Sequence, residues 1–251
     1  MRAAAAVLGA VTASALACGD DSAGPPAQGD RGAGVGALGG SATTRALART
    51  RLDERPAGEL AWVAHATRLA PGASIAHRHE LSFVYARQGS HFLRAAGRRR
   101  ILGEGEGAAL EADLPHRHEA GGDSSTFWEI RLAASGSQPR GAAPAGRVFE
   151  SEPLEGIPAP ARVSFVEVTV PPRGGRTTVH THPGPEFIYE LSGRIEYQNA
   201  IIGTRRLGPG GAEGIPPDTA VQKRNPFARP ATFLSFFLVD PDLPFAPGAS
   251  F

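Results

Sequence analysis

Short apolar runs alternate with turn-forming residues along most of the chain after residue 60. Val163–Val170, for example, is rich in β-branched residues and ends at Pro171 and Pro172. Runs of this length, bounded by Gly and Pro, are typical of β-strands rather than helices. A high content of Gly and Pro with few aromatic residues fits the same interpretation. The pattern predicts an all-β chain of many short strands, the last of them over residues 231–239.

The scheme of strands and turns occurs twice. Equivalent residues of the two copies are separated by a nearly constant number of positions. The separation is 103 residues from His77 to His180, 104 from Gly89 to Gly193, and 105 from His116 to Val221. This offset is longer than the repeats of solenoid proteins. We therefore expect two copies of one barrel, over residues 51–133 and 147–251. Residues 134–146, which are mainly Ala, Gly, Ser and Pro, predict a linker between them.

The first fifty residues predict export rather than folded structure. Residues 1–17 combine Arg2 with a short apolar stretch that ends in Ala15-Leu16-Ala17, which is typical of a cleaved signal. Cys18 follows directly and resembles the first residue of a mature bacterial lipoprotein. Residues 18–50 contain too few large apolar residues to form a core, so we expect a disordered tether. We expect a protein anchored to a membrane by a lipid on Cys18, or otherwise periplasmic or secreted.

Charge and cysteine content exclude several classes of function. The formal net charge of +1 over 251 residues gives no reason to expect binding to nucleic acid or to an anionic membrane surface. Cys18 is the only cysteine, which excludes an internal disulfide and a Cys-based zinc site. The remaining candidate partners are small molecules, metal ions and a second copy of the chain.

The chemistry is concentrated in the histidines. His180 and His182 are two residues apart, so on a strand their imidazoles point to the same side. Glu186 follows after a Pro-Gly-Pro turn and begins a new apolar run. Two imidazoles and one carboxylate form a ligand set that suits a non-haem iron or a manganese ion. The alternative interpretation is a pair of surface histidines in a Thr-rich strand.

The spacing around these residues resembles the first motif of the cupin superfamily, G-x5-H-x-H-x3-E-x6-G, at every fixed position from Gly174 to Gly193. The second motif, G-x5-P-x-G-x2-H-x3-N, is matched only in part, because Asp218 replaces its second glycine and Val221 its histidine. The resemblance implies two tandem cupin barrels, of the double-stranded β-helix or jelly-roll type, after the N-terminal tether.

The first copy has a different set of candidate ligands. His77, His79 and His116 fall at the histidine positions, whereas Ser82 stands where the motif has its glutamate. We interpret Ser82 as a non-ligand, and we expect the metal to be held by His77, His79 and His116 in one barrel and by His180, His182 and Glu186 in the other. Iron or manganese is the first choice, with zinc, nickel and copper as alternatives. Glu80 and His118 are the candidate general bases.

The resemblance implies an exported metal-binding bicupin, similar to the quercetinase-type dioxygenases, that acts on a small oxygen-rich organic substrate. The alternative is a module that captures a small molecule or metal at the cell surface without catalysis. A homodimer is consistent with both. Because one fold hosts many activities, the sequence leaves the choice between enzyme and binding module open.

Overall fold

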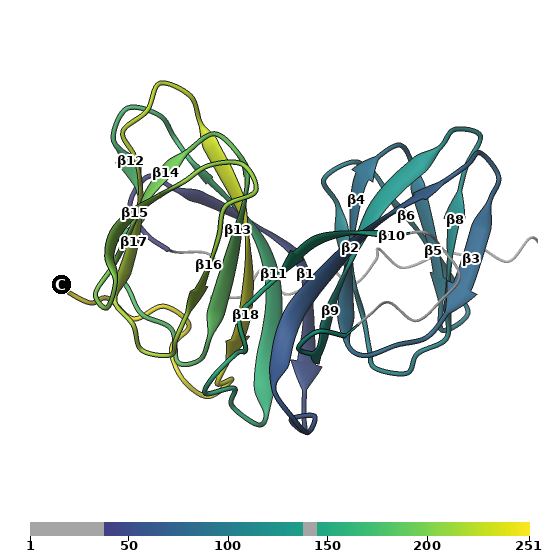
Figure 1. The fold of residues 1–251 in the computed structure, drawn as a ribbon, viewed down its shortest axis with the longest axis horizontal. Helices are drawn as coiled ribbons and strands as arrows, with labels where there is room; N and C mark the ends of the chain where they lie inside the picture. Colours follow the sequence, from purple (N-terminus) through teal and green to yellow (C-terminus); the bar gives the residue numbers. More distant parts are fainter. Residues whose placement is uncertain (1–37, 138–144) are drawn as a thin grey trace, which may run out of the picture. The chain divides into compact units, whose positions relative to one another are not determined.

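A computed structural model describes residues 38–137 and 145–251, and within these ranges it contains strands and turns but no helix (Figure 1). Accordingly, the described part of the chain has no helix long and apolar enough to cross a membrane. The all-β prediction is confirmed. The expected signal, Cys18 and most of the expected tether lie outside the described residues.

The N-terminal barrel consists of two antiparallel sheets. The larger sheet has the strand order β10 (Ala145–Glu150), β2 (Leu60–Leu69), β9 (Ser125–Ala134), β4 (Ser82–Gln88) and β7 (Gly107–Leu110). The smaller sheet has the order β3 (Ser74–His77), β8 (His116–Ala120), β5 (His91–Ala95) and β6 (Arg98–Leu102).

The C-terminal barrel repeats this plan. Its larger sheet has the order β1 (Thr43–Leu52), β11 (Ala161–Val170), β18 (Ala231–Val239), β13 (Glu186–Ser192) and β16 (Ala212–Ile215). Its smaller sheet has the order β12 (Gly175–Arg176), β17 (Val221–Asn225), β14 (Ile195–Asn199) and β15 (Gly203–Leu207). Each barrel is thus a double-sheet jelly roll, as the sequence predicts.

The two barrels exchange their first strands, and this corrects two of the expected boundaries. Strand β1 pairs with β11 of the C-terminal barrel, from Thr43 opposite Thr169 to Leu52 opposite Ala161. Residues 43–50 therefore belong to a sheet and not to a tether that ends at residue 50. Conversely, β10 pairs with β2 of the N-terminal barrel, so its residues do not belong to the C-terminal barrel expected over 147–251. Both strands are rich in polar and small residues and supply few side chains to the core. The pattern of apolar residues therefore does not predict them.

One apolar cluster receives side chains from the larger sheets of both barrels. Trp62 and Phe83 come from β2 and β4, and Phe165 and Phe236 come from β11 and β18. The rings of Phe165 and Phe236 are stacked, with centroids 4.9 Å apart, and Trp62 lies 5.5 Å from Phe236. The opposite faces of these sheets therefore point into the barrels, where the candidate ligands are.

The motif glycines have a structural reason in both copies. Gly193 has φ of +80° and a Cβ there would lie 2.2 Å from the Pro230 carbonyl oxygen. Gly89 has φ of +71° and the same kind of contact with Ser124. Only glycine fits such a left-handed turn against a neighbouring backbone. These two turns end β4 and β13, the strands that face the candidate sites.

Candidate metal centres

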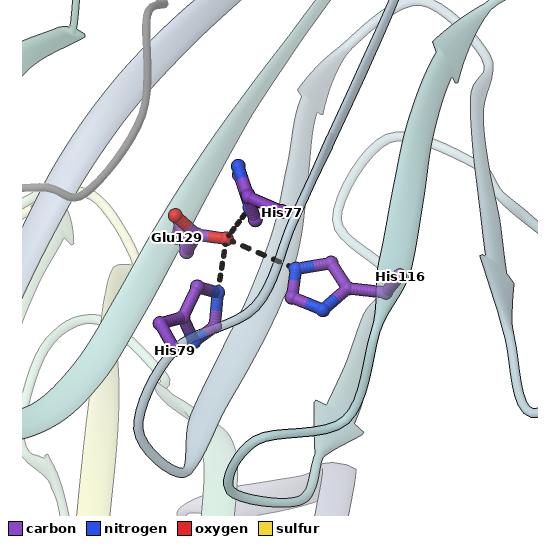
Figure 2. Close-up of side chains that lie close together, drawn as sticks. All are labelled: His77, His79, His116 and Glu129. Atoms are coloured by element: carbon purple, nitrogen blue, oxygen red, sulfur yellow. Dashed lines mark hydrogen bonds and ion pairs between the residues drawn. The ribbon is translucent and has the colours of Figure 1, made fainter.

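Four side chains meet inside the N-terminal barrel, and one of them was not expected. His77, His79 and His116 converge as the sequence predicts, and the carboxylate of Glu129 on β9 completes the cluster (Figure 2). The Nε2 atoms of His77, His79 and His116 lie 2.9, 2.6 and 3.6 Å from Glu129 Oε1. Such an arrangement of three imidazoles and one carboxylate is a ligand set for a divalent transition metal.

Backbone carbonyls fix the orientation of two of these imidazoles. His79 Nδ1 donates a hydrogen bond to the Glu80 carbonyl at 2.7 Å, and His116 Nδ1 donates to the Leu114 carbonyl at 2.8 Å. In a neutral ring the proton is then on Nδ1, so Nε2 points its lone pair at the Glu129 carboxylate. Lone pairs that face an anion repel it, so these contacts are favourable when a proton or a metal ion is shared between the ring nitrogens and the carboxylate. Hydrogen bonds of this type are the usual support of metal-binding histidines.

His118 lies beside the cluster and is held by a second histidine. Its Nε2 is 3.4 Å from Glu129 Oε1, and a hydrogen bond of 2.8 Å joins its Nδ1 to His91 Nε2. His91 Nδ1 in turn lies 3.1 Å from Ser125 Oγ. Burial lowers the pKa of His118 to about 4 and that of His91 to about 3. Both rings are therefore neutral near pH 7 and supply no positive charge to the site.

Glu129 is ionised in this surrounding. Burial alone would raise its pKa, but the imidazoles of His116, His118, His77 and His79, which stabilise the carboxylate when they carry a proton on Nε2, hold it well below its usual value. The carboxylate therefore contributes a negative charge to the cluster, and His116 Nε2 and His118 Nε2 are buried without a hydrogen-bond partner among the described residues. Buried polar atoms of this kind are rare in native proteins unless a ligand, ion or water satisfies them.

Glu80, one of the two expected general bases, contacts Arg131, and not the ligand cluster, through its carboxylate. Its Oε2 accepts a hydrogen bond from Arg131 Nη1 at 3.2 Å, and its carboxylate is not among the groups that meet in the cluster. Glu129 takes the place that a carboxylate from the first motif would have. Ser82 is buried, and its hydroxyl has no hydrogen-bond partner among the described residues.

The C-terminal barrel brings together all three of its expected ligands. His180, His182 and Glu186 are buried, and their donor atoms could surround a common point. His180 Nδ1 donates to the Thr178 carbonyl at 2.9 Å and His182 Nδ1 to the Phe245 carbonyl at 2.6 Å, which again leaves Nε2 facing inward. Burial lowers the pKa of His180 to about 3, with a further contribution from Lys223, and burial also lowers the pKa of His182.

This barrel contains a cation of its own. Lys223 Nζ donates to Glu186 Oε2 at 2.8 Å, and Ser235 Oγ donates to Glu186 Oε1 at 2.8 Å. All three residues are fully buried. Burial alone would raise the pKa of Glu186, yet Lys223 and the neighbouring histidines hold it below its usual value. The carboxylate is thus an anion with both oxygens already hydrogen-bonded.

The two sites are related by an exchange of positions. Ser82 and Glu186 are the first residues of β4 and β13, whereas Glu129 and Ser235 lie opposite the third residues of those strands. The N-terminal barrel therefore has serine where its partner has glutamate, and the reverse. Similarly, His118 and Lys223 are the third residues of β8 and β17, and His116 and Val221 the first. Each ligand cluster contains one carboxylate, but the two carboxylates come from different strands.

Two residues of the sites, Lys223 and Glu129, are not part of the cupin motif, but the sequence contains a signal for each of them. Lys223 is the single lysine among the 26 Lys and Arg residues of the chain, and it stands in an alternating strand two positions after Val221. Glu129 interrupts the apolar strand Ser125–Ala134, where an inward-facing charge needs a partner. Neither position is fixed by the motif, so the pairing with the histidines required the fold.

Comparison with known proteins supports the class that this fold and these sites define. Residues 166–237 match the cupin domain family, which covers the core of the C-terminal barrel. Together with the jelly-roll fold of both barrels, this supports placing the chain in the cupin superfamily. A search of the curated proteins finds no match.

Several solved structures share the two-barrel fold. The oxalate decarboxylase of Lactobacillus farciminis, solved as a formate complex, aligns with a TM-score of 0.57 and 18% identity over 84% of each chain. A Bacillus subtilis oxalate decarboxylase, studied for its Mn(II) centres, aligns with a TM-score of 0.54 and 20% identity over 84% of this chain and 76% of that one. AerE from Microcystis aeruginosa aligns with a TM-score of 0.51 and 14% identity over 78% and 99%. These similarities establish the bicupin fold.

Proposed function

We propose that this chain is a metal-dependent bicupin whose N-terminal barrel binds a small organic carboxylate at a divalent metal ion. The observation that carries the proposal is the convergence of three imidazoles on one oxygen of Glu129, with two of the ring lone pairs fixed toward it. The donor set contains nitrogen and oxygen but no sulfur, which suits manganese or iron. The Mn(II) centres of the structurally similar Bacillus subtilis enzyme agree with manganese as the first candidate.

Arg131 gives the site a means of recognising an anion. Arg131 lies two residues after Glu129 on β9, so both side chains are on the same face of the strand. Its side chain is buried, and its Nε and Nη2 groups have no hydrogen-bond partner among the described residues. Such a pair of donors matches the two oxygens of a carboxylate. We propose that they orient a carboxylate group of the substrate toward the cluster.

The chemistry would then be decarboxylation or oxygenation of a small oxygen-rich acid. A bound divalent metal would polarise a substrate oxygen as a Lewis acid. The protein supplies the fixed ligands, the anion-binding arginine and a barrel interior that excludes water. Acid–base catalysis would fall to Glu80, which Arg131 holds by one hydrogen bond, or to His118. The low pKa of His118 favours a role in positioning Glu129 over that of a base near pH 7.

One observation favours the alternative, a binding module without turnover. Neither base candidate is free and tuned for proton transfer, because Glu80 is paired with Arg131 and His118 is a weak base.

Residues 1–18 predict export. We therefore propose that the protein works outside the cytoplasm, either anchored through Cys18 or released. Its small-molecule ligand would then be an extracellular or periplasmic acid.

The proposal is tested by binding of small carboxylates to the metal-loaded protein. The full chain loaded with Mn(II) is titrated with oxalate and formate, and the electron paramagnetic resonance spectrum of the metal is followed. We expect the spectrum to change in the wild type and not in Arg131→Met, with Arg117→Met as the control on the smaller sheet. Release of carbon dioxide or uptake of oxygen then distinguishes an enzyme from a binding module. A spectrum that no carboxylate changes would contradict the proposed substrate class.

A further inference from the structure

We propose that the C-terminal barrel works without a divalent metal, and that the ammonium group of Lys223 is the cation that its carboxylate and imidazoles surround. The proposal deepens the proposed function, on which it rests for the assignment of the metal to the N-terminal barrel. It gives each chain one exchangeable metal site and one fixed cation, at equivalent positions of two copies of the same fold.

The hydrogen bonds of Glu186 favour a lysine over a metal ion as its partner. Lys223 Nζ and Ser235 Oγ each donate a 2.8 Å hydrogen bond to this carboxylate, one to each oxygen. A divalent ion ligated by Glu186 would lie within a few ångströms of the ammonium group. Lys223 and Glu186 have no exposed surface, so water would not screen the repulsion between the two cations. The carboxylate can satisfy the lysine or the metal, but not both at once.

The second argument comes from the equivalent position in the other barrel. Lys223 and His118 are each the third residue of their strands, β17 and β8. His118 is neutral and is held by His91, so the ligand cluster of the N-terminal barrel consists of imidazoles and a carboxylate. The fixed positive charge inside this barrel, Arg131, is bonded to Glu80, whose carboxylate is not part of the cluster. In the C-terminal barrel the fixed positive charge, Lys223, is bonded to the carboxylate of the cluster itself. Val221 also removes the imidazole that His116 contributes in the other copy.

The residue at position 223 is a lysine and not an arginine. The chain uses arginine at every other basic position, and its one lysine is the residue buried against Glu186. An ammonium group is a compact point charge with donors in three directions, whereas a guanidinium group is planar and larger. Lysine therefore resembles a metal ion more closely than arginine does as a partner of Glu186. At an exposed position either residue would serve.

The test is the number of metal ions that each chain retains. The full-length protein is incubated with excess Mn(II), freed of unbound metal by dialysis, and analysed for metal and protein. We expect about one ion per chain in the wild type and about two in Lys223→Met, which removes the charge but keeps the length of the side chain. Arg224→Met, at the exposed neighbouring position, should remain at one.

Thermal unfolding provides a second readout. Lys223→Met leaves Glu186 buried without a counter-charge, so Mn(II) should raise the melting temperature of this variant more than that of the wild type. Should Lys223→Met fold poorly, the double variant His180→Ala/His182→Ala decides, because it should still bind one ion per chain. Two ions in the wild type, the same metal count in the wild type and a folded Lys223→Met protein, or a metal count that falls in the double histidine variant would each overturn the proposal.

The outcomes also separate this proposal from the function proposed for the N-terminal barrel. A wild-type chain without metal whose Lys223→Met variant binds one ion would contradict the N-terminal metal site and support the role of Lys223. A wild type with one ion that is lost in His77→Ala/His79→Ala supports both. A chain that binds no ion with or without Lys223 would refute both.

Discussion

Glu129 Oε1 lies 2.6 Å from His79 Nε2, although Glu129 is on β9, His79 is in the loop between β3 and β4, and the two residues are 50 positions apart. The ring proton of His79 is engaged by the Glu80 carbonyl through Nδ1. The contact therefore brings His79 Nε2 against a carboxylate, which is favourable when the two groups share a proton or both bind one metal ion. Glu129 thus supplies the carboxylate that is missing from the motif of the N-terminal barrel, where Ser82 stands.

The exchange of serine and glutamate between the two barrels can be reversed. In the double variant Ser82→Glu/Glu129→Ser the carboxylate would enter the N-terminal barrel from β4, as Glu186 enters the other barrel from β13. We expect Glu129→Ser alone to weaken metal binding at least about tenfold, since lost supporting groups already cost about 10–100-fold. The double variant should recover most of this loss. Metal affinity measured by competition with a chelator checks the expectation, and equal affinities for the single and double variants would contradict it.

Glu190 should make the protein less stable as the pH rises. It is 1% exposed, both of its carboxylate oxygens lack a hydrogen-bond partner among the described residues, and burial raises its pKa from 4.5 to about 8. The folded state therefore favours the neutral form. This contribution to stability is fully present below pH 4.5 and is lost as the pH rises toward about 8, at up to about 1.4 kcal/mol per pH unit.

Glu190→Gln removes the ionisable group and should flatten this dependence. Urea unfolding at pH 5 and pH 8 measures it, and Glu155→Gln, at an exposed position, is the control. We expect the difference in unfolding free energy between the two pH values to shrink in Glu190→Gln and to stay unchanged in Glu155→Gln. If Glu190→Gln leaves the difference as large as in the wild type, Glu190 is not the group that titrates.

Strand β1 should stabilise the fold through Leu47. This side chain is 6% exposed and lies in the apolar cluster that both barrels share. A Cβ at Gly107 would lie 3.0 Å from Leu47 Cβ and 3.0 Å from the Phe165 ring, which shows how closely β1 approaches β7. Leu47→Ala should therefore lower the free energy of unfolding by about 2–5 kcal/mol. Ile101→Ala, at a position 57% exposed, should change it by less than about 0.5 kcal/mol. An effect of Leu47→Ala no larger than that of Ile101→Ala would mean that β1 does not support the fold.

Export through Cys18 is open to a direct experiment. If Cys18 carries a lipid, the mature protein partitions with membranes and begins at this residue, and Cys18→Ser moves it to the soluble fraction. Fractionation of cells that express each form, with the N-terminus identified by mass spectrometry, provides the measurement. Unchanged partitioning of Cys18→Ser would exclude the lipid anchor and leave plain secretion.

The sequence predicted those features that local patterns determine. The strands follow from alternation, the two copies from the constant offset, and the five motif histidines and one glutamate from fixed spacing. The strand exchange was missed because the partners of β1 and β10 lie far away in the sequence. Glu129 and Lys223 were missed for the same reason, since each meets the histidines only across the barrel. The partner of Glu80 was missed as well, because Arg131, which donates a hydrogen bond to its carboxylate, is 51 residues away. The role of Glu80 as a base stays a prediction.

The central claim is that the N-terminal barrel binds a divalent metal through His77, His79, His116 and Glu129. The most direct measurement is the dissociation constant for Mn(II) of the full-length wild type and of two matched variants, Glu129→Gln and Glu186→Gln. Each substitution replaces one buried carboxylate with a neutral amide of the same shape. We expect Glu129→Gln to weaken Mn(II) binding at least about tenfold and Glu186→Gln to leave it unchanged. Weaker binding in Glu186→Gln with full affinity in Glu129→Gln would place the metal in the other barrel and contradict the account.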